Sequence, residues 1–236
     1  MNAVSKILAT GILASTVGMA HAVPTDLADL KADDGTTTLF SQVAAGEYSD
    51  TGASYVELTD ANSVNDDVTA FLLFEFAGFS EDNAFGIYDM NSFNPNDVGS
   101  TNILEIFSGS NSPTSDLTVS FDVNAGTAEL NGTTANIGSY FGFYLERSGT
   151  RFYSDASLNS AGTDMALMYD VAGTQNQGMF GSDILVAFED VLDGDMDFND
   201  LVVGVSDVKV VSEPGTLALF SLGLLGFGLA RRRNKA

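Results

Sequence analysis

The chain has 236 residues, of which 32 are acidic and nine are basic, so its formal net charge is −23 at pH 7. This charge excludes an ordinary nucleic-acid binder, because phosphate contacts require lysine and arginine. The absence of cysteine excludes a disulfide framework, a thiolate nucleophile and a cysteine-ligated zinc site. With 44% hydrophobic residues, the chain is able to bury a core.

Residues 1–22 have the three parts of a secretory signal peptide. Lys6 supplies the positive charge, residues 7–17 form a short apolar stretch, and Ala20-His21-Ala22 form an A-x-A cleavage site. A first core helix is the alternative, but the charged flank and the small residues at the end favour a signal peptide. Cleavage by signal peptidase after Ala22 would remove His21, the single histidine of the chain.

Residues 23–211 are predicted to form one acidic domain. All 32 acidic residues lie between Asp26 and Glu213, together with four basic residues, which gives this part a net charge of −28. Such a charge favours solubility and repels other acidic polymers.

The pattern of this domain is that of an all-β protein. Short apolar or alternating runs predict strands at 38–44, 54–58, 68–76, 103–107, 117–123, 140–146, 165–169, 184–188 and 201–211. Clusters of Gly, Asn, Asp and Ser separate them, and Asn131-Gly132 is typical of a type I′ hairpin turn. Helix signals are limited to a short turn within residues 25–31. We therefore expect a single antiparallel β-sandwich with a jelly-roll-like arrangement.

An acidic cluster precedes the last predicted strand. Seven carboxylates fall between Asp183 and Asp200, and four ligand-type side chains recur at every second position. These four residues are Asp193, Asp195, Asp197 and Asn199. In an extended backbone this spacing places their oxygens on one side, and Met196 and Phe198 on the other side, toward a core.

Crowded carboxylates repel one another unless a cation neutralises them, and Ca²⁺ prefers six to eight oxygen ligands. The cluster is not an EF-hand, because Phe198 and Gly204 occupy the positions where that loop requires Gly and Glu. A solvated acidic turn is the alternative. The predicted calcium ligands are Glu189, Asp190, Asp193, Asp195, Asp197, Asn199 and Asp200.

The segment FEDVLDGDMDFNDLVVGV at 188–205 resembles the signature of domain-of-unknown-function family 4114. This family is a module of bacterial secreted and surface proteins. Two segments upstream, at 76–88 and 157–167, are similar to segments of related exported proteins, so the resemblance extends over about 71–205. It implies no established activity, and the metal-site prediction rests on the chemistry of the side chains.

The C-terminal segment 212–236 carries a sorting pattern. An uncharged run of 15 residues, 216–230, is followed by Arg231, Arg232, Arg233 and Lys235. The run is shorter than the roughly 20 residues that usually span a bilayer, but arginine side chains snorkel and extend it. We expect a hydrophobic anchor helix with the basic cluster in the cytoplasm. A buried core helix is the alternative, which three glycines within the run disfavour.

Ser212-Glu213-Pro214, the apolar run and the arginine cluster together resemble the PEP-CTERM sorting signal. The resemblance implies an inner-membrane precursor, processing by an exosortase near Glu213-Pro214, and transfer to the cell surface or extracellular matrix. It also implies a Gram-negative bacterium that makes an exopolysaccharide.

Three functions fit these observations. An enzyme is disfavoured, because no imidazole remains after signal-peptide cleavage and a glycoside hydrolase needs two acids across a cleft. A calcium-dependent carbohydrate-binding module is the alternative, with Tyr55, Tyr88, Tyr140 and Tyr153 as stacking candidates. We favour a non-catalytic surface or biofilm-matrix protein with a calcium-stabilised loop, associated with exopolysaccharide and without a nucleic-acid partner.

Overall fold

A computed structural model describes residues 25–32, 34–61, 66–75, 83–94, 96, 102–109, 111, 113–173, 181–192 and 194–211. The predicted signal peptide, the sorting segment 212–236 and Asp193 lie outside these residues. Among the described residues, no helix is long and apolar enough to cross a membrane.

The described residues form strands and short 3₁₀ turns. The strands are β1 (Tyr55–Leu58), β2 (Asp66–Glu75), β3 (Asn83–Asp89), β4 (Ile103–Ser108), β5 (Asp116–Asp122), β6 (Thr127–Leu130), β7 (Thr133–Ala135), β8 (Tyr140–Arg147), β9 (Thr150–Tyr153), β10 (Ala166–Asp170), β11 (Ile184–Phe188), β12 (Leu201–Val205) and β13 (Val208–Val211). The 3₁₀ turns are Leu27–Asp29, Ala156–Leu158 and Ser160–Gly162.

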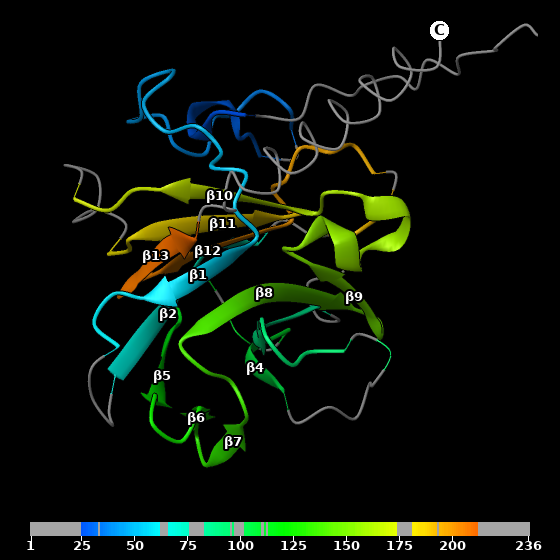
Figure 1. The fold of residues 1–236 in the computed structure, drawn as a ribbon. Helices are drawn as coiled ribbons and strands as arrows, with labels where there is room; N and C mark the ends of the chain where they lie inside the picture. The colour runs from blue at the N-terminus through cyan, green and yellow to red at the C-terminus, as the bar shows by residue number, and fades with distance from the viewer. Residues whose placement is uncertain are drawn as a thin grey trace, which may run out of the picture.

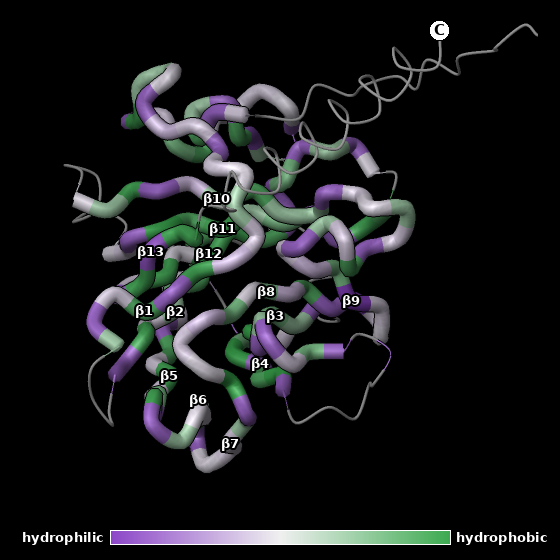
Figure 2. The backbone as a smooth tube through the Cα atoms, in the orientation of Figure 1, coloured by the Kyte–Doolittle hydropathy of each residue, from purple (hydrophilic) through white to green (hydrophobic). Residues whose placement is uncertain are grey.

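These strands form two antiparallel sheets, which confirms the predicted all-β class (Figure 1). One sheet has the order β13-β1-β8-β3-β4, with β9 also paired to β8. The other has the order β10-β11-β12-β2-β5-β6-β7. The largest hydrophobic cluster lies between the sheets and includes Phe85 and Phe143, whose rings stack at 5.8 Å, and Phe188. Hydrophobic stretches are concentrated around β11 and β12 (Figure 2).

A second core covers the outer face of β10, β11 and β12. Leu27, Leu30 and Phe40 of the N-terminal segment pack there against Leu185 and Val202. The blue N-terminal segment of Figure 1 accordingly lies over β10 and β11. All five residues of β11 and all five of β12 are buried, because both faces of this hairpin are covered. Two-sided burial explains their uninterrupted apolar sequences.

Two strand predictions are wrong. Residues 38–44 form turns, in which Val43 N–H donates to the Phe40 carbonyl at 2.9 Å and both side chains enter the second core. Residues 201–211 form two strands in different sheets, β12 and β13. The chain turns at Asp207, which has a φ of 59° and donates its N–H to Asp183 Oδ2 at 2.6 Å.

The Asn131-Gly132 turn is confirmed, since φ is 51° and 85° at these residues between the paired Leu130 and Thr133. Strands β3, β6, β7 and β9 were missed as strands, although the predicted turn at Asn131-Gly132 joins β6 to β7. A sequence signal for β3 is a motif that it shares with β8: β3 contains Phe-Gly-Ile-Tyr at 85–88, and β8 contains Phe-Gly-Phe-Tyr at 141–144.

These two motifs pair so that each glycine lies opposite a tyrosine. Gly86 is opposite Tyr144, and Gly142 is opposite Tyr88. A Cβ at Gly86 would lie 2.7 Å from the Tyr144 ring and would collide with the carbonyl oxygen of Leu104. A Cβ at Gly142 would lie 2.5 Å from the Tyr88 ring. Each tyrosine thus packs over the glycine of the neighbouring strand.

We predict that Gly86→Ala destabilises the protein by about 2–3 kcal/mol, because the backbone carbonyl of Leu104 has no room to move away from the new methyl group. The thermal midpoint should fall by about 5–10 °C in a melting experiment. Gly138→Ala is the control, since its Cβ would be 3.7 Å from its nearest neighbour, Asp89 Oδ1. Equal midpoints for the two variants would show that the close packing at Gly86 does not matter.

Candidate metal site

The acidic cluster forms the loop that joins β11 to β12. These strands are antiparallel neighbours, and Phe188 is opposite Leu201 in their register. The residues next to this pair, Glu189 and Asp200, therefore lie at the same end of the sheet. The backbone N–H of Asp190 donates to Asp200 Oδ2 at 2.8 Å, which closes the base of the loop.

Two apolar side chains of this loop enter the core, as the sequence predicts, but Asn199, which was predicted on the opposite side with the aspartates, is also buried. Phe198 is fully buried in the second core, and Met196 packs against the same core. Both residues have a positive φ, 56° at Met196 and 55° at Phe198. Asp195, which precedes Met196, is exposed, and Asp197, which lies between Met196 and Phe198, is half-buried. The anchored apolar side chains thus fix the direction in which the two carboxylates point.

Three carboxylates converge in this loop. Glu189, Asp195 and Asp197 each offer an oxygen, and the three oxygens lie within 4.8 Å of one another. Calcium–oxygen distances of about 2.3–2.6 Å place two ligands of one ion at most about 5 Å apart. The spacing of these oxygens therefore fits a shared Ca²⁺ ion, and equally another hard cation of similar size.

Glu189 is the buried member of this group, with 1% of its surface exposed. Its Oε1 accepts the backbone N–H of Phe198 at 2.7 Å. Its Oε2 faces Gly194, where a Cβ would lie 3.0 Å from that oxygen. The loop therefore wraps around the Glu189 carboxylate, which enters from the end of β11.

Burial raises the pKa of Glu189 to about 7, against the opposing effect of the Phe198 N–H; the charges of Asp200, Asp197 and Asp195 add to the increase. Burial likewise raises the pKa of Asp200 to about 7, and the charges of Asp190, Asp197 and Asp195 add to the increase. The loop thus concentrates negative charge that folding does not fully compensate, and a bound cation would compensate it.

Two of the other predicted ligands are engaged by protein groups. Asp190 Oδ1 forms an ion pair with Arg147 Nη1 at 3.1 Å, and Asp190 Oδ2 lies 3.5 Å from Asn83 Nδ2. Asn199 Nδ2 donates to the Lys31 carbonyl and to Asp197 Oδ2, both at 2.7 Å. These residues hold the loop to β8, β3 and the N-terminal segment.

Asp200 also has one oxygen engaged, by the Asp190 N–H, and the predicted ligand Asp193 lies outside the described residues. Sequence reasoning missed Arg147 and Asn83 as partners of the loop. Arg147 has a sequence signal, because it is one of four basic residues between Asp26 and Glu213. Asn83 has none that distinguishes it from other polar strand residues.

The tyrosines considered for sugar stacking lie mainly inside the protein. Tyr88 and Tyr153 are 1% and 6% exposed and belong to an aromatic cluster on the outer face of β3, β8 and β9, against which Tyr55 packs. Tyr88 meets Tyr153 edge to face at 5.4 Å. Tyr140 is 39% exposed. Of these four rings, three therefore contribute to packing.

The predicted sorting and cleavage residues lie outside the described residues, so their predicted roles come from sequence. The sorting residues are Ser212, Glu213, Pro214, Arg231, Arg232 and Arg233, and the cleavage residues are Ala20 and Ala22. Comparison with protein families bears on the C-terminal ones. Residues 210–233 match the PEP-CTERM protein-sorting motif, and residues 123–207 match a domain of unknown function (DUF4114). The second match contains the entire candidate metal loop.

No curated protein and no solved structure matches the chain. The sorting motif supports an exported protein of a Gram-negative bacterium that is processed by exosortase from a membrane-anchored precursor. This chain carries a DUF4114 domain followed by a PEP-CTERM sorting motif.

Proposed function

We propose that this protein is a non-catalytic component of the cell surface or extracellular matrix whose β11–β12 loop binds Ca²⁺. The convergence of the Glu189, Asp195 and Asp197 oxygens within 4.8 Å is the observation that carries the metal assignment. The raised pKa of Glu189 supports it, because a cation would relieve the repulsion that burial intensifies. Extracellular calcium sites bind weakly, with dissociation constants of about 10⁻⁴–10⁻³ M.

The non-catalytic assignment rests on the residues available for chemistry. The single histidine, His21, belongs to the predicted signal peptide. Glycoside hydrolysis by paired carboxylates requires a separation of about 5–10 Å across a cleft. Glu189, Asp195 and Asp197 bring oxygens within 4.8 Å of one another, and Glu189 is 1% exposed. They are better arranged to share a cation than to act on opposite sides of a sugar ring.

The surface or matrix assignment rests on the sorting motif and on charge. The region between Asp26 and Glu213 carries 32 acidic and four basic residues. In a matrix that contains acidic polysaccharide, such a domain would repel its surroundings unless divalent cations screen or bridge the charges. A calcium site would therefore suit the exported protein to that environment.

We predict that 1 mM Ca²⁺ stabilises the full-length protein, held in a zwitterionic detergent. For a dissociation constant of about 10⁻⁴ M, the gain is about 1.4 kcal/mol, or roughly 3–6 °C in the thermal midpoint. Asp195→Asn and Asp197→Asn should each abolish this shift relative to EDTA. Asp116→Asn, at an exposed position of β5, should retain it. An identical loss in all three variants would indicate diffuse screening, and no shift in the wild type would indicate a solvated acidic turn.

The pH dependence should differ with and without the ion. The folded-state pKa of Glu189, about 7, lies above the ordinary value of 4.5. The folded state therefore binds this proton more tightly, and the resulting stability is present below about pH 4 and is lost as the pH rises through 7. In EDTA, we expect Glu189→Gln to be more stable than the wild type at pH 8, by on the order of 2 kcal/mol, and to show no calcium shift.

Chemical denaturation at pH 5 and pH 8 measures this effect. At pH 5 the stability difference between Glu189→Gln and the wild type should shrink, because the wild-type carboxyl is then mostly protonated. If the difference in stability between the wild type and Glu189→Gln in EDTA is the same at pH 5 and pH 8, the buried-charge explanation of the site is contradicted.

We predict that the exported protein begins at Val23 and ends near Pro214, which intact-mass measurement would establish. Glu213→Ala combined with Pro214→Ala should leave the precursor in the inner membrane, because exosortase processing depends on the sorting motif. The matched control is Glu129→Ala, an exposed residue of β6 far from the motif. A surface protein that retains residues 1–22 and 215–236 would refute both processing sites.

A further inference from the structure

Strand β13 belongs both to the folded domain and to the sorting motif. It spans Val208–Val211 and pairs with β1 along its whole length, with Val208 opposite Leu58 and Val211 opposite Tyr55. The match to the sorting motif begins at residue 210, inside this strand. Two residues of β13 are therefore assigned at once to a sheet and to the motif that exosortase processes.

The predicted processing site lies very close to the sheet. Pro214 is three residues beyond Val211, and three extended residues span at most about 11 Å. The uncharged run begins at Thr216, so at most about 18 Å of chain connects the end of β13 to the predicted membrane segment. At the end of so short a connection, the folded domain would occupy the space in which an enzyme must surround the chain.

A paired β13 is also a poor substrate in itself. An enzyme that cuts a peptide chain holds the residues beside the cut in an extended conformation, commonly through hydrogen bonds to their backbone groups. In β13 such groups are engaged by β1, and Val208 is fully buried. Val210 packs against the core between the sheets. These residues can therefore enter an enzyme cleft only after β13 has separated from β1.

The fold allows this separation. β13 is a four-residue strand at the edge of its sheet, and its pairing among the described strands is with β1 alone (Figure 1). Directly before it, the Asp207 N–H donates to Asp183 Oδ2 at 2.6 Å, and the Ser206 N–H donates to the Thr69 carbonyl at 3.0 Å. These bonds do not involve β13, so its unpairing ends at Asp207 and leaves β12 in place.

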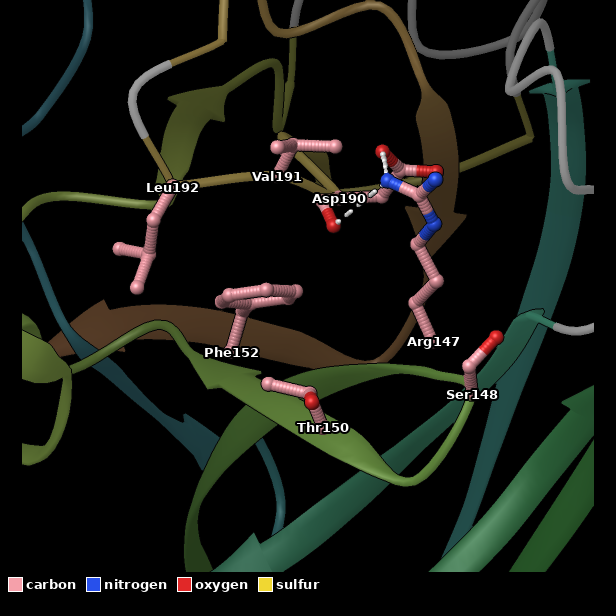
Figure 3. A pocket seen from close by; sticks show the side chains of 7 residues that line it. All are labelled: Arg147, Ser148, Thr150, Phe152, Asp190, Val191 and Leu192. Atoms are coloured by element: carbon pink, nitrogen blue, oxygen red, sulfur yellow. Dashed lines mark hydrogen bonds and ion pairs between the residues drawn. The ribbon is translucent and has the colours of Figure 1, made fainter.

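An ion pair connects β13 to β1, but it is exposed. Lys209 Nζ lies 2.7 Å from Glu57 Oε1, and the lysine side chain is 54% exposed. Exposed ion pairs contribute little to stability, so this contact does not prevent release. Strand β9 offers the contrast, because it too has four residues and pairs with one strand, β8. The β8–β9 hairpin is bound to the segment after β11 by the Arg147–Asp190 ion pair (Figure 3).

We propose that exosortase processes this chain only while β13 is separated from β1, so that the edge strand controls access to the sorting motif. The processed chain, which is predicted to end near Pro214, retains all of β13, and the strand then pairs with β1 again. This inference rests on the proposed processing near Pro214 and is independent of the calcium loop.

The test locks β13 to β1 with a disulfide. Glu57→Cys combined with Lys209→Cys replaces two residues that are directly opposite each other, at a spacing that a disulfide can bridge. The chain has no other cysteine, so no competing disulfide forms. The full-length precursor is purified in detergent from a host without exosortase, oxidised, and mixed with membranes of the producing bacterium. Intact mass measures the rate of processing with and without dithiothreitol.

We expect the oxidised precursor to be processed at least tenfold more slowly than the same protein after reduction. Because the two forms share one sequence, a folding defect of the substitutions would affect both. Glu146→Cys combined with Arg151→Cys is the matched control, since it replaces an ion pair of 2.6 Å between the opposite residues of β8 and β9. The control should be processed equally fast in both redox states.

A second variant keeps the oxidised lock but lengthens the chain beyond it. About ten glycine and serine residues, followed by a second copy of Val210–Val211, are inserted after Val211. The insertion supplies a flexible segment before the processing site without release of β13. It should restore the wild-type rate of processing.

Equal rates for the oxidised and reduced lock would overturn the proposal, as would a lengthened variant that remains slow. Equal slowing of the control lock would also overturn it, because oxidation rather than β13 would then limit processing. These three results leave the proposed processing site standing. A wild-type precursor that the membranes cut inside the run 216–230, or do not cut at all, would contradict that site and this inference with it.

Discussion

Burial of the β11–β12 hairpin on both faces is the constraint on which the rest of the structure depends. One face packs into the core between the sheets, and the other is covered by the N-terminal segment. No charged side chain occurs within either strand, so the carboxylates of this region are confined to the connecting loop. The loop is fastened to the same covered face through Phe198, and to the covering segment through the Asn199–Lys31 hydrogen bond. The hydrophobic layer thus holds the acidic group together despite its repulsion.

The region that matches DUF4114 does not make its sheets alone. Strand β12 lies beside β2, and β8 lies between β1 and β3, which precede the matched residues 123–207. The reciprocal Gly–Tyr pairing of β3 and β8 shows how closely the two parts are fitted, because each glycine is covered by a tyrosine from the other strand. The candidate metal loop therefore sits on a scaffold to which residues well before the match contribute.

Two of the four basic residues between Asp26 and Glu213 form partly buried ion pairs. Arg147 pairs with Asp190, and Arg151 pairs with Glu146 at 2.6 Å while its guanidinium lies 5.2 Å from the centre of the Tyr144 ring. Several other described carboxylates accept backbone N–H groups, as Asp34 does from Thr36 and Thr37. Glu189 and Asp200 receive one such bond each, and burial still raises their pKa values to about 7. A cation at this loop would supply the positive charge that the sequence itself lacks.

The sequence by itself determined the all-β class, the type I′ turn at Asn131-Gly132 and the apolar character of Met196 and Phe198, because these features depend on composition, local periodicity and turn chemistry. The positive φ values at Met196 and Phe198, which turn the loop so that both side chains reach the core, were decided by the tertiary structure. Tertiary structure alone decided which carboxylates converge. Asp190 is drawn to Arg147, 43 residues earlier in the chain, because β8 lies across from the end of β11, whereas Glu189 turns toward Asp195 and Asp197. It likewise decided that Tyr88 packs over Gly142 and that the apolar run at 201–211 divides between two sheets. Such choices follow from strand order and long-range pairing, on which local patterns carry no information.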